Sequence, residues 1–349
     1  MSFRTPTRPL IRLAVCLLLC GLATAAGARQ PQQQDQSKKT ADRIEKKTYE
    51  FKDAGKEMEY ALFVPSGYDK AKKAPLIVAL HGLGGNPQQM IRSRGLTDQA
   101  EKYGYIVVAP MGYNSGGWYG ARGPGGGSGG PGGFGTPPGT VLSPRVQDNL
   151  KLTDEQKKKI GELQKEVDAS IQKILTEEQN KQLKDLKANA GRGFPGGLGG
   201  GQDAPANLGE LSEKDVMNVL ALVRKEFTID DKRIYLIGHS MGGGGTWHLG
   251  TKYADVWAGL APIAPAAFGQ PTGLDKLKNI PVIVVQGDKD TLVRPEGTRR
   301  WVEKLKELNV PHEYLEIAGA GHGDVISKGM PQIFEFFEKQ QKKKQDQGK

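Results

Sequence analysis

The sequence predicts an α/β sandwich, in which a mostly parallel central sheet carries helices on both faces. Short apolar runs rich in Val, Ile and Leu alternate with segments whose apolar residues recur at helical spacing. Several runs are continuously apolar, as expected for strands that are buried on both faces of a parallel sheet. Such alternation of strands and helices is typical of a sheet between two helical layers.

The expected elements follow one another along most of the chain. The strands are expected at 59–64, 75–80, 105–109, 233–237, 257–263, 281–286 and 312–317. The main helices are expected at 87–103, 212–227, 246–253, 297–308 and 330–339. A short run at 49–51 and the strand at 59–64 should form an antiparallel hairpin at the edge of the sheet.

Residues 1–28 are expected to lie outside this fold. Arginines precede an apolar run, 13–22, and small residues follow it, which is typical of a secretory signal with cleavage after Ala25 or Ala28. The run is about half of the roughly 20 residues that a membrane-spanning helix needs. We therefore expect export to the periplasm or the medium, with no stable membrane insertion once the signal is removed.

Both cysteines, Cys16 and Cys20, lie inside this leader. The rest of the chain then has no thiol for a disulfide, a nucleophile or a metal ligand. Lipidation of Cys20 remains open as an alternative fate of the leader. Part of the net charge of +10 comes from a Lys-rich tail, 339–349, which is expected to be disordered. No basic patch interleaved with aromatic residues indicates a nucleic-acid partner.

One section interrupts the alternation of strands and helices. Two Gly/Pro-rich segments, 123–139 and 191–201, flank a charged helical pair at about 152–188. Each helix begins with Leu-Thr, two acidic residues and Gln, a pattern that predicts a capping box. We interpret this section as a spacer, with a binding role as the alternative. The expected organisation is a signal at 1–28, a linker at 29–45, the sandwich at 46–122 and 206–338, an insertion at 123–205 and a tail at 339–349.

The most informative motif is Gly238-His239-Ser240-Met241-Gly242, between an expected strand and an expected helix. Gly-x-Ser-x-Gly in this context is typical of a nucleophile elbow. Glycine is needed on both sides because a Cβ would obstruct the sharp turn. The turn places the Ser240 hydroxyl at a helix N-terminus, where partial positive charge favours an oxyanion.

A serine nucleophile needs a base, a carboxylate that orients the base, and N–H donors for the oxyanion. His322 follows the strand at 312–317, and Asp290 follows the strand at 281–286. The segment 81–83, His-Gly-Leu, follows the strand at 75–80, where a second oxyanion donor belongs. These residues supply every required group in the chain order serine, acid, histidine.

Other polar residues near these motifs leave alternatives open. Asp288 is an alternative acid to Asp290, and Asp324 is a possible contact of the neighbouring His322. His239 and His248 have no partner that the sequence identifies. No cluster of His, Asp or Glu has metal-ligand spacing, so no metal or other cofactor is expected.

The four ordered motifs resemble those of the α/β-hydrolase superfamily. Within it, the chain is similar to secreted esterases grouped with feruloyl esterases, polyhydroxybutyrate-depolymerase-like and dienelactone-hydrolase-like proteins. The resemblance covers about 46–338 apart from the insertion. It implies acyl transfer, in which Ser240 attacks an ester, His322 takes its proton and Asp290 orients His322. It also implies that the backbone N–H groups of Leu83 and Met241 bind the oxyanion.

The leading interpretation is an exported serine esterase that acts on carboxylic esters of plant polysaccharides or aromatic acids. Trp118 and Tyr119 are candidates for stacking on an aromatic acyl group, with ordinary packing as the alternative. A serine peptidase of the prolyl-oligopeptidase type is an alternative function, although its propeller does not fit in 349 residues. A non-catalytic envelope binding module on a hydrolase shell is another. The sequence names neither the ester nor the oligomeric state.

Overall fold

The computed structural model describes residues 40–121, 139–142, 147, 150–189, 205, 207–268 and 270–340. The expected leader, both Gly/Pro-rich segments, most of the linker and the basic tail lie outside these residues, apart from their edges. Across the described ranges, no helix has the length and apolar character needed to span a membrane.

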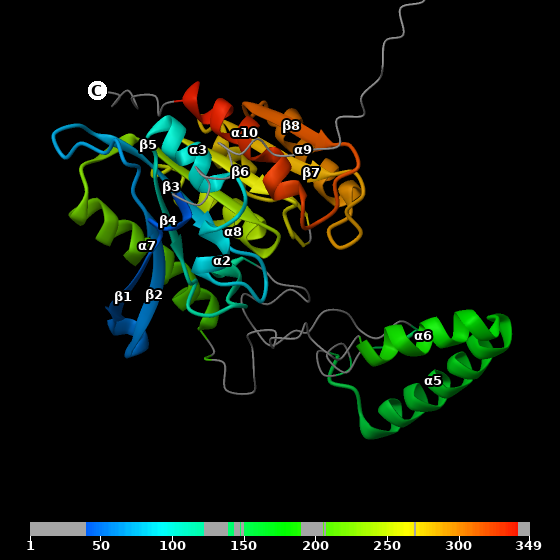
Figure 1. Ribbon diagram of the computed structural model, residues 1–349. Helices are drawn as coiled ribbons and strands as arrows, with labels where there is room; N and C mark the ends of the chain where they lie inside the picture. Colours follow the sequence, from blue (N-terminus) through cyan, green and yellow to red (C-terminus); the bar gives the residue numbers. More distant parts are fainter. Residues whose placement is uncertain are drawn as a thin grey trace, which may run out of the picture.

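An eight-stranded sheet forms the centre of the molecule (Figure 1). Its strand order is β1-β2-β4-β3-β5-β6-β7-β8. An antiparallel hairpin of β1 (Glu45–Phe51) and β2 (Lys56–Phe63) forms one edge, and β2 is also antiparallel to β4 (Ile106–Pro110). The remaining neighbours are parallel: β3 (Ala74–Leu80), β5 (Ile229–His239), β6 (Gly259–Ile263), β7 (Val282–Gly287) and β8 (His312–Ile317).

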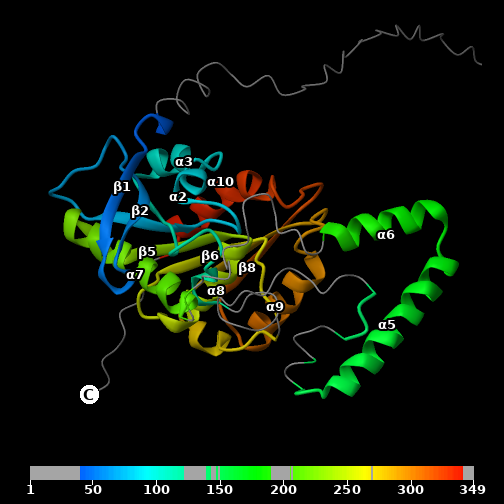
Figure 2. The same ribbon diagram turned by 90° about the horizontal axis from the view of Figure 1, so that it is seen from below.

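Helices cover both faces of the sheet, as Figures 1 and 2 show. One core lies under α7 (Leu208–Glu226), α8 (Met241–Lys252) and α9 (Pro295–Glu307). The other lies under α2 (Pro87–Ile91), α3 (Leu96–Tyr103) and α10 (Val325–Glu338). Leu76 and Val78 enter the first core, whereas Ile77 and Ala79 enter the second. Because successive strand residues face opposite sides, strands buried on both faces have continuous apolar sequences. The predicted fold class is confirmed.

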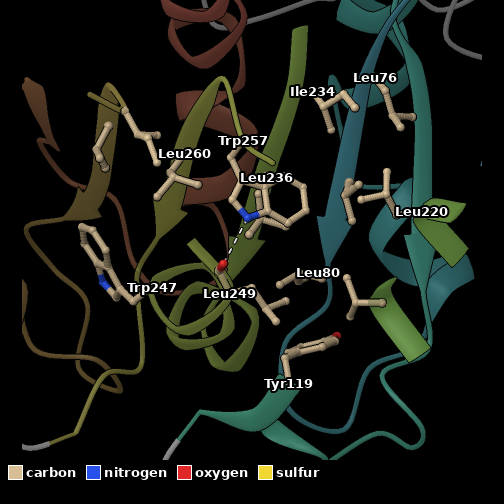
Figure 3. Packing of buried hydrophobic residues seen from close by; sticks show 14 of the residues in the cluster. Leu76, Leu80, Tyr119, Leu220, Ile234, Leu236, Trp247, Leu249, Trp257 and Leu260 are labelled. Atoms are coloured by element: carbon tan, nitrogen blue, oxygen red, sulfur yellow. Dashed lines mark hydrogen bonds between the residues drawn. The ribbon is translucent and has the colours of Figure 1, made fainter. Parts of the chain in front are cut away.

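A buried contact fixes α8 against the sheet. The indole N–H of Trp257 donates to the carbonyl of Leu249 at 3.0 Å (Figure 3). Leu236 and Leu260 are both fully buried in the same cluster. Burying a side chain of this size contributes about 1.5–3 kcal/mol. Helix α8 is therefore held in a defined place on the sheet.

Several helix boundaries differ from those predicted. The helix expected at 87–103 is divided into α2 and α3, because Gly95 takes φ 87° between them. Helix α8 begins at Met241 rather than 246, since a run of glycines lets it start directly after the turn. Helix α10 begins at Val325 and continues through Pro331. A proline lacks the N–H of a regular helix, which is why the preceding turn was not predicted to be helical.

The predicted helical pair is present as α5 (Asp154–Ile174) and α6 (Glu177–Asn189). Thr153 and Gln156 form the expected capping box, and Thr176 and Gln179 form the same pair of hydrogen bonds. Helix α5 has no buried residue. In Figure 1 the pair lies outside the sheet and its two helical layers, so it does not contribute to either core.

Candidate active site

Ser240 occupies a strained turn between β5 and α8. Its φ and ψ are 58° and −115°, a combination that an L-residue rarely adopts. Such strain costs about 1–3 kcal/mol and persists only where surrounding contacts enforce it. Here the Ser240 N–H donates to the Ile263 carbonyl at 2.9 Å. The Ser240 carbonyl accepts from Gly244 at 3.1 Å and from Ala266 at 2.9 Å.

The glycines of the motif are required by close backbone contacts. A Cβ on Gly238 would lie 2.1 Å from the carbonyl oxygen of Gly242. A Cβ on Gly242 would lie 2.3 Å from the carbonyl oxygen of Leu80. Because these neighbours are backbone atoms, a side chain could be accommodated only by moving a strand or the helix. The predicted reason for glycine on both sides of Ser240 is confirmed.

The segment 81–83 lies directly beside the turn. A Cβ on Gly82 would be 3.4 Å from the Cβ of Ser240. The His81 ring is buried, and its Nε2 lies 2.8 Å from the carbonyl of Met111. Burial lowers the pKa of His81, and its two ring nitrogens face the carbonyls of Gly82 and Met111. Leu83 thus follows a glycine at which an added Cβ would contact Ser240, and Met241 begins α8 with an N–H that has no acceptor within the helix.

His322 and Asp290 form a direct pair. The distance from His322 Nδ1 to Asp290 Oδ2 is 2.7 Å, and Asp290 is only 3% exposed. The other carboxylate oxygen accepts from the backbone N–H groups of Leu292 and Val293, each at 2.9 Å. Gln286 donates to Oδ2 at 3.2 Å. These bonds hold the carboxylate in the orientation that receives the His322 ring.

The two alternative carboxylates bind elsewhere. Asp288 accepts from the backbone N–H of Gly319 at 2.7 Å. Asp324 accepts from the N–H of Gly321 at 2.7 Å and forms an ion pair with Lys328. The structure therefore brings Asp290, rather than Asp288 or Asp324, to the imidazole of His322.

His239 connects the nucleophile turn to the segment that carries His322. Its Nε2 donates to the His322 carbonyl at 2.8 Å, and the two ring centroids are 4.7 Å apart. Burial, followed by the neighbouring His322, lowers the pKa of His239 to about 4. His239 is therefore neutral near pH 7 and orients the backbone of His322. Sequence reasoning found no partner for it, because 83 residues separate the two histidines.

Trp118 and Tyr119 belong to the short helix η2 (Trp118–Gly120), which is fixed by α7. Ser212 accepts from the Tyr119 N–H at 2.9 Å, and Asp215 accepts from the Gly112 N–H at 2.6 Å. Burial raises the pKa of Asp215 to about 6. Tyr119 is fully buried and Trp118 is 6% exposed, so both rings pack inside the protein. This burial agrees with the alternative interpretation, in which the two rings serve ordinary packing rather than stacking on an aromatic acyl group.

Comparison with known proteins supports the resemblance inferred from the motifs. Residues 52–126 match a family described as "Putative esterase", and residues 202–344 match the dienelactone hydrolase family. The first match contains the segment 81–83, and the second contains Ser240, Asp290 and His322. Both matched segments lie in the sandwich, on either side of the helical pair.

Curated relatives share only part of this chain. A bifunctional acetylxylan esterase/xylanase from Neocallimastix patriciarum is 29% identical over 26% of this chain and 13% of its own length. Cutinase 2 from Thermobifida cellulosilytica is 30% identical over 27% of this chain and 34% of its own length. The chain thus spans about a third or less of these two relatives.

Solved structures show that the fold is that of α/β-hydrolases. A thermostable esterase is 20% identical, with a TM-score of 0.50 over 86% of this chain and 64% of its own. A ferulic acid esterase is 13% identical, with a TM-score of 0.51 over 84% of this chain and 97% of its own. The predicted α/β-hydrolase fold, and the similarity to esterases within it, are confirmed.

The variant His239→Gln is expected to change how stability depends on pH. His239 has a pKa of about 4 in the folded protein against an ordinary value of 6.5, so between these values the unfolded chain binds the proton and the folded protein does not. The stability due to neutral His239 is complete above pH 6.5 and is lost as the pH falls towards 4. Urea titrations across this range should show a shallower fall in unfolding free energy for the variant. Parallel curves for variant and wild type would contradict the assignment.

Proposed function

We propose that the protein is a serine esterase that hydrolyses carboxylic esters outside the cytoplasm. The observation that carries the proposal is the hydrogen bond between Asp290 and His322, whose carbonyl accepts from His239, the residue before Ser240. The matches to esterase and dienelactone hydrolase families support the reaction class. The leader-like composition of residues 1–28 supports export.

The contact between His322 and Asp290 supports an assignment of the proton transfers. Because His322 Nδ1 is bonded to Asp290, its Nε2 is the nitrogen that accepts a proton in the neutral ring. In the proposed mechanism, Nε2 takes the Ser240 proton as the hydroxyl attacks the ester carbonyl, and later returns it to the departing alcohol. Asp290 stabilises the transient imidazolium. Water then attacks the carbonyl of the acyl-enzyme as it gives a proton to the same nitrogen. The bond between the acyl group and the Ser240 oxygen breaks, Nε2 returns the proton to that oxygen, and the acid is released.

Backbone N–H groups stabilise the oxyanion in this proposal. The donors are Met241, at the N-terminus of α8, and Leu83, in the segment that touches Ser240. Both are carried by backbone that close contacts fix in place, so they need little rearrangement during the reaction. A single donor of this kind is worth about 3 kcal/mol of barrier.

Two classes of ester fit the comparisons. The name of one relative refers to acetylxylan, and one structural neighbour is a ferulic acid esterase. We therefore propose that the substrate is an ester of a polysaccharide or of an aromatic acid. The mechanism above is the same for both classes, because it uses only the ester group.

Activity measurements on substituted proteins distinguish the proposed triad residues from the nearby Asp288. Ser240→Ala should abolish hydrolysis of 4-nitrophenyl acetate, and Asp290→Asn should lower kcat/KM by about 10³- to 10⁴-fold by removing the group that orients His322. Asp288→Asn is the matched control and should stay within about threefold of wild type, because Asp288 contacts the Gly319 backbone instead. Equal rates for wild type and Ser240→Ala would refute the proposal, and a larger loss in Asp288→Asn than in Asp290→Asn would refute the assignment of the acid.

We also infer that residues 123–205 are an insertion that the reaction does not require. The absence of buried residues in α5 supports this inference. Replacing the insertion with a Gly/Ser linker should leave kcat for 4-nitrophenyl acetate within about twofold, because such linkers behave as flexible coils and loop length costs little. A large loss of kcat in a variant that retains wild-type thermal stability would show that the insertion acts in catalysis.

A further inference from the structure

A cavity adjoins the nucleophile turn but lies outside the triad. Its volume is about 510 Å³, and it is bordered by α8, by the segment after β6 and by α9. Gly244 and Ala266 are in its wall, and these are the two residues whose N–H groups donate to the Ser240 carbonyl. The cavity therefore begins within one helical turn of Ser240. None of the three predicted catalytic side chains lines it.

Aromatic side chains form much of the wall. Trp247 and Trp301 stack on each other, with centroids 5.2 Å apart and ring planes at 22°. Phe268 is 41% exposed and packs its ring against Trp118 at 5.6 Å. Phe268 is thus a supported aromatic ring that remains accessible. Figure 3 shows Trp247 on the side of α8 away from Tyr119.

Trp247 also carries an unused hydrogen-bond donor. Its side chain is 2% exposed, and its indole N–H has no acceptor among the described residues. A buried polar group without a partner costs about 1–3 kcal/mol. Because Trp247 also lines the cavity, a small movement of its ring would let a ligand oxygen accept this proton.

Further polar groups surround the cavity, and one of them is held by a buried carboxylate. His248 Nε2 donates to Glu213 at 2.7 Å, which leaves Nδ1 as an acceptor in the neutral ring. Burial opposes ionisation of Glu213, but hydrogen bonds from His248, Lys252 and Tyr253 outweigh it and lower its pKa to about 2. The negative charge of Glu213 is thus stabilised by contacts with His248, Lys252 and Tyr253. The wall also contains three neutral polar side chains, those of Thr251, Gln270 and Thr272.

The composition of the wall selects among ligands. Among the residues that the structure describes, the wall contains no Asp, Glu, Lys or Arg, which favours an uncharged ligand. A plain acyl chain, or an aromatic ring with one hydroxyl, would desolvate several of these polar groups without replacing their hydrogen bonds. A sugar ring has apolar C–H faces that suit Phe268 and a rim of hydroxyl groups that suit the polar side chains. The volume is within the range of small-ligand pockets.

We propose that this cavity binds an uncharged sugar residue of the glycan that carries the ester. The inference rests on the proposed esterase function for its link to the reaction, but it makes a separate claim about binding. A sugar seated on Phe268 and bonded to the indole N–H of Trp247 would lie next to the Ser240 turn. Its attached ester would then be held near the nucleophile, so occupancy of the cavity lowers KM for glycan esters.

The binding claim is tested without catalysis. Calorimetric titration of the Ser240→Ala protein with neutral tetrasaccharides of xylose, glucose, mannose and galactose should give binding to at least one of them. Phe268→Ala in the same background should weaken it by about tenfold or more. Leu163→Ala is the matched control, since Leu163 is 46% exposed on α5 and remote from the cavity wall. If no tetrasaccharide binds, or if Phe268→Ala binds as well as the control, the proposal is overturned.

Kinetics distinguish the failure of this proposal from failure of the esterase function. Trp247→Phe removes the N–H but keeps an aromatic ring, and Phe268→Ala changes an accessible side chain. The kinetic substrates are 4-nitrophenyl acetate and the acetyl ester of the tetrasaccharide that binds. Each variant should lower kcat/KM for the acetylated tetrasaccharide, relative to kcat/KM for 4-nitrophenyl acetate, by about tenfold. The change should come from a higher KM for the acetylated tetrasaccharide. An unchanged ratio in an active enzyme overturns the sugar site and leaves the esterase function standing. Absence of hydrolysis of both esters by the wild type would instead refute the esterase function.

Discussion

The site depends on a steric constraint at the start of α8. Gly238, Gly242 and the carbonyl of Leu80 approach one another so closely that no side chain fits between them. This packing allows the helix to begin directly after β5, and it holds Ser240 in its strained conformation. Every other group of the candidate site is defined relative to this turn. Gly82 lies so near that an added Cβ would contact the Ser240 side chain, and the Ala266 N–H donates to the Ser240 carbonyl.

Long-range hydrogen bonds attach the remaining groups to the turn. Asp290 is fixed by the backbone that follows it and receives the His322 ring. His239 donates a hydrogen bond to the backbone carbonyl of the same histidine. His322 is thus constrained at both its ring and its carbonyl. Such constraint limits the rearrangement needed during proton transfer, which is where preorganised sites gain rate.

Local patterns predicted the strands and the turn, because these depend on neighbouring residues. The choice of Asp290 as the acid stays a prediction, and the structure adds that its carboxylate accepts from the Val293 N–H and lies beside His322. The His239–His322 bond and the stacking of Trp247 on Trp301 could not be predicted in this way. Each joins elements that are distant in the sequence and meet only through the sheet topology. The break in the helix expected at 87–103 also could not be predicted, because it depends on the positive φ of Gly95.

The central claim is that Ser240 is the nucleophile of an assembled triad. The most direct measurement is to treat the folded protein with a fluorophosphonate and to locate the adduct by peptide mass spectrometry. The account predicts one adduct, on Ser240, that is lost when the protein is unfolded in urea before treatment. Absence of an adduct in the folded protein, or an adduct on another residue, would contradict it.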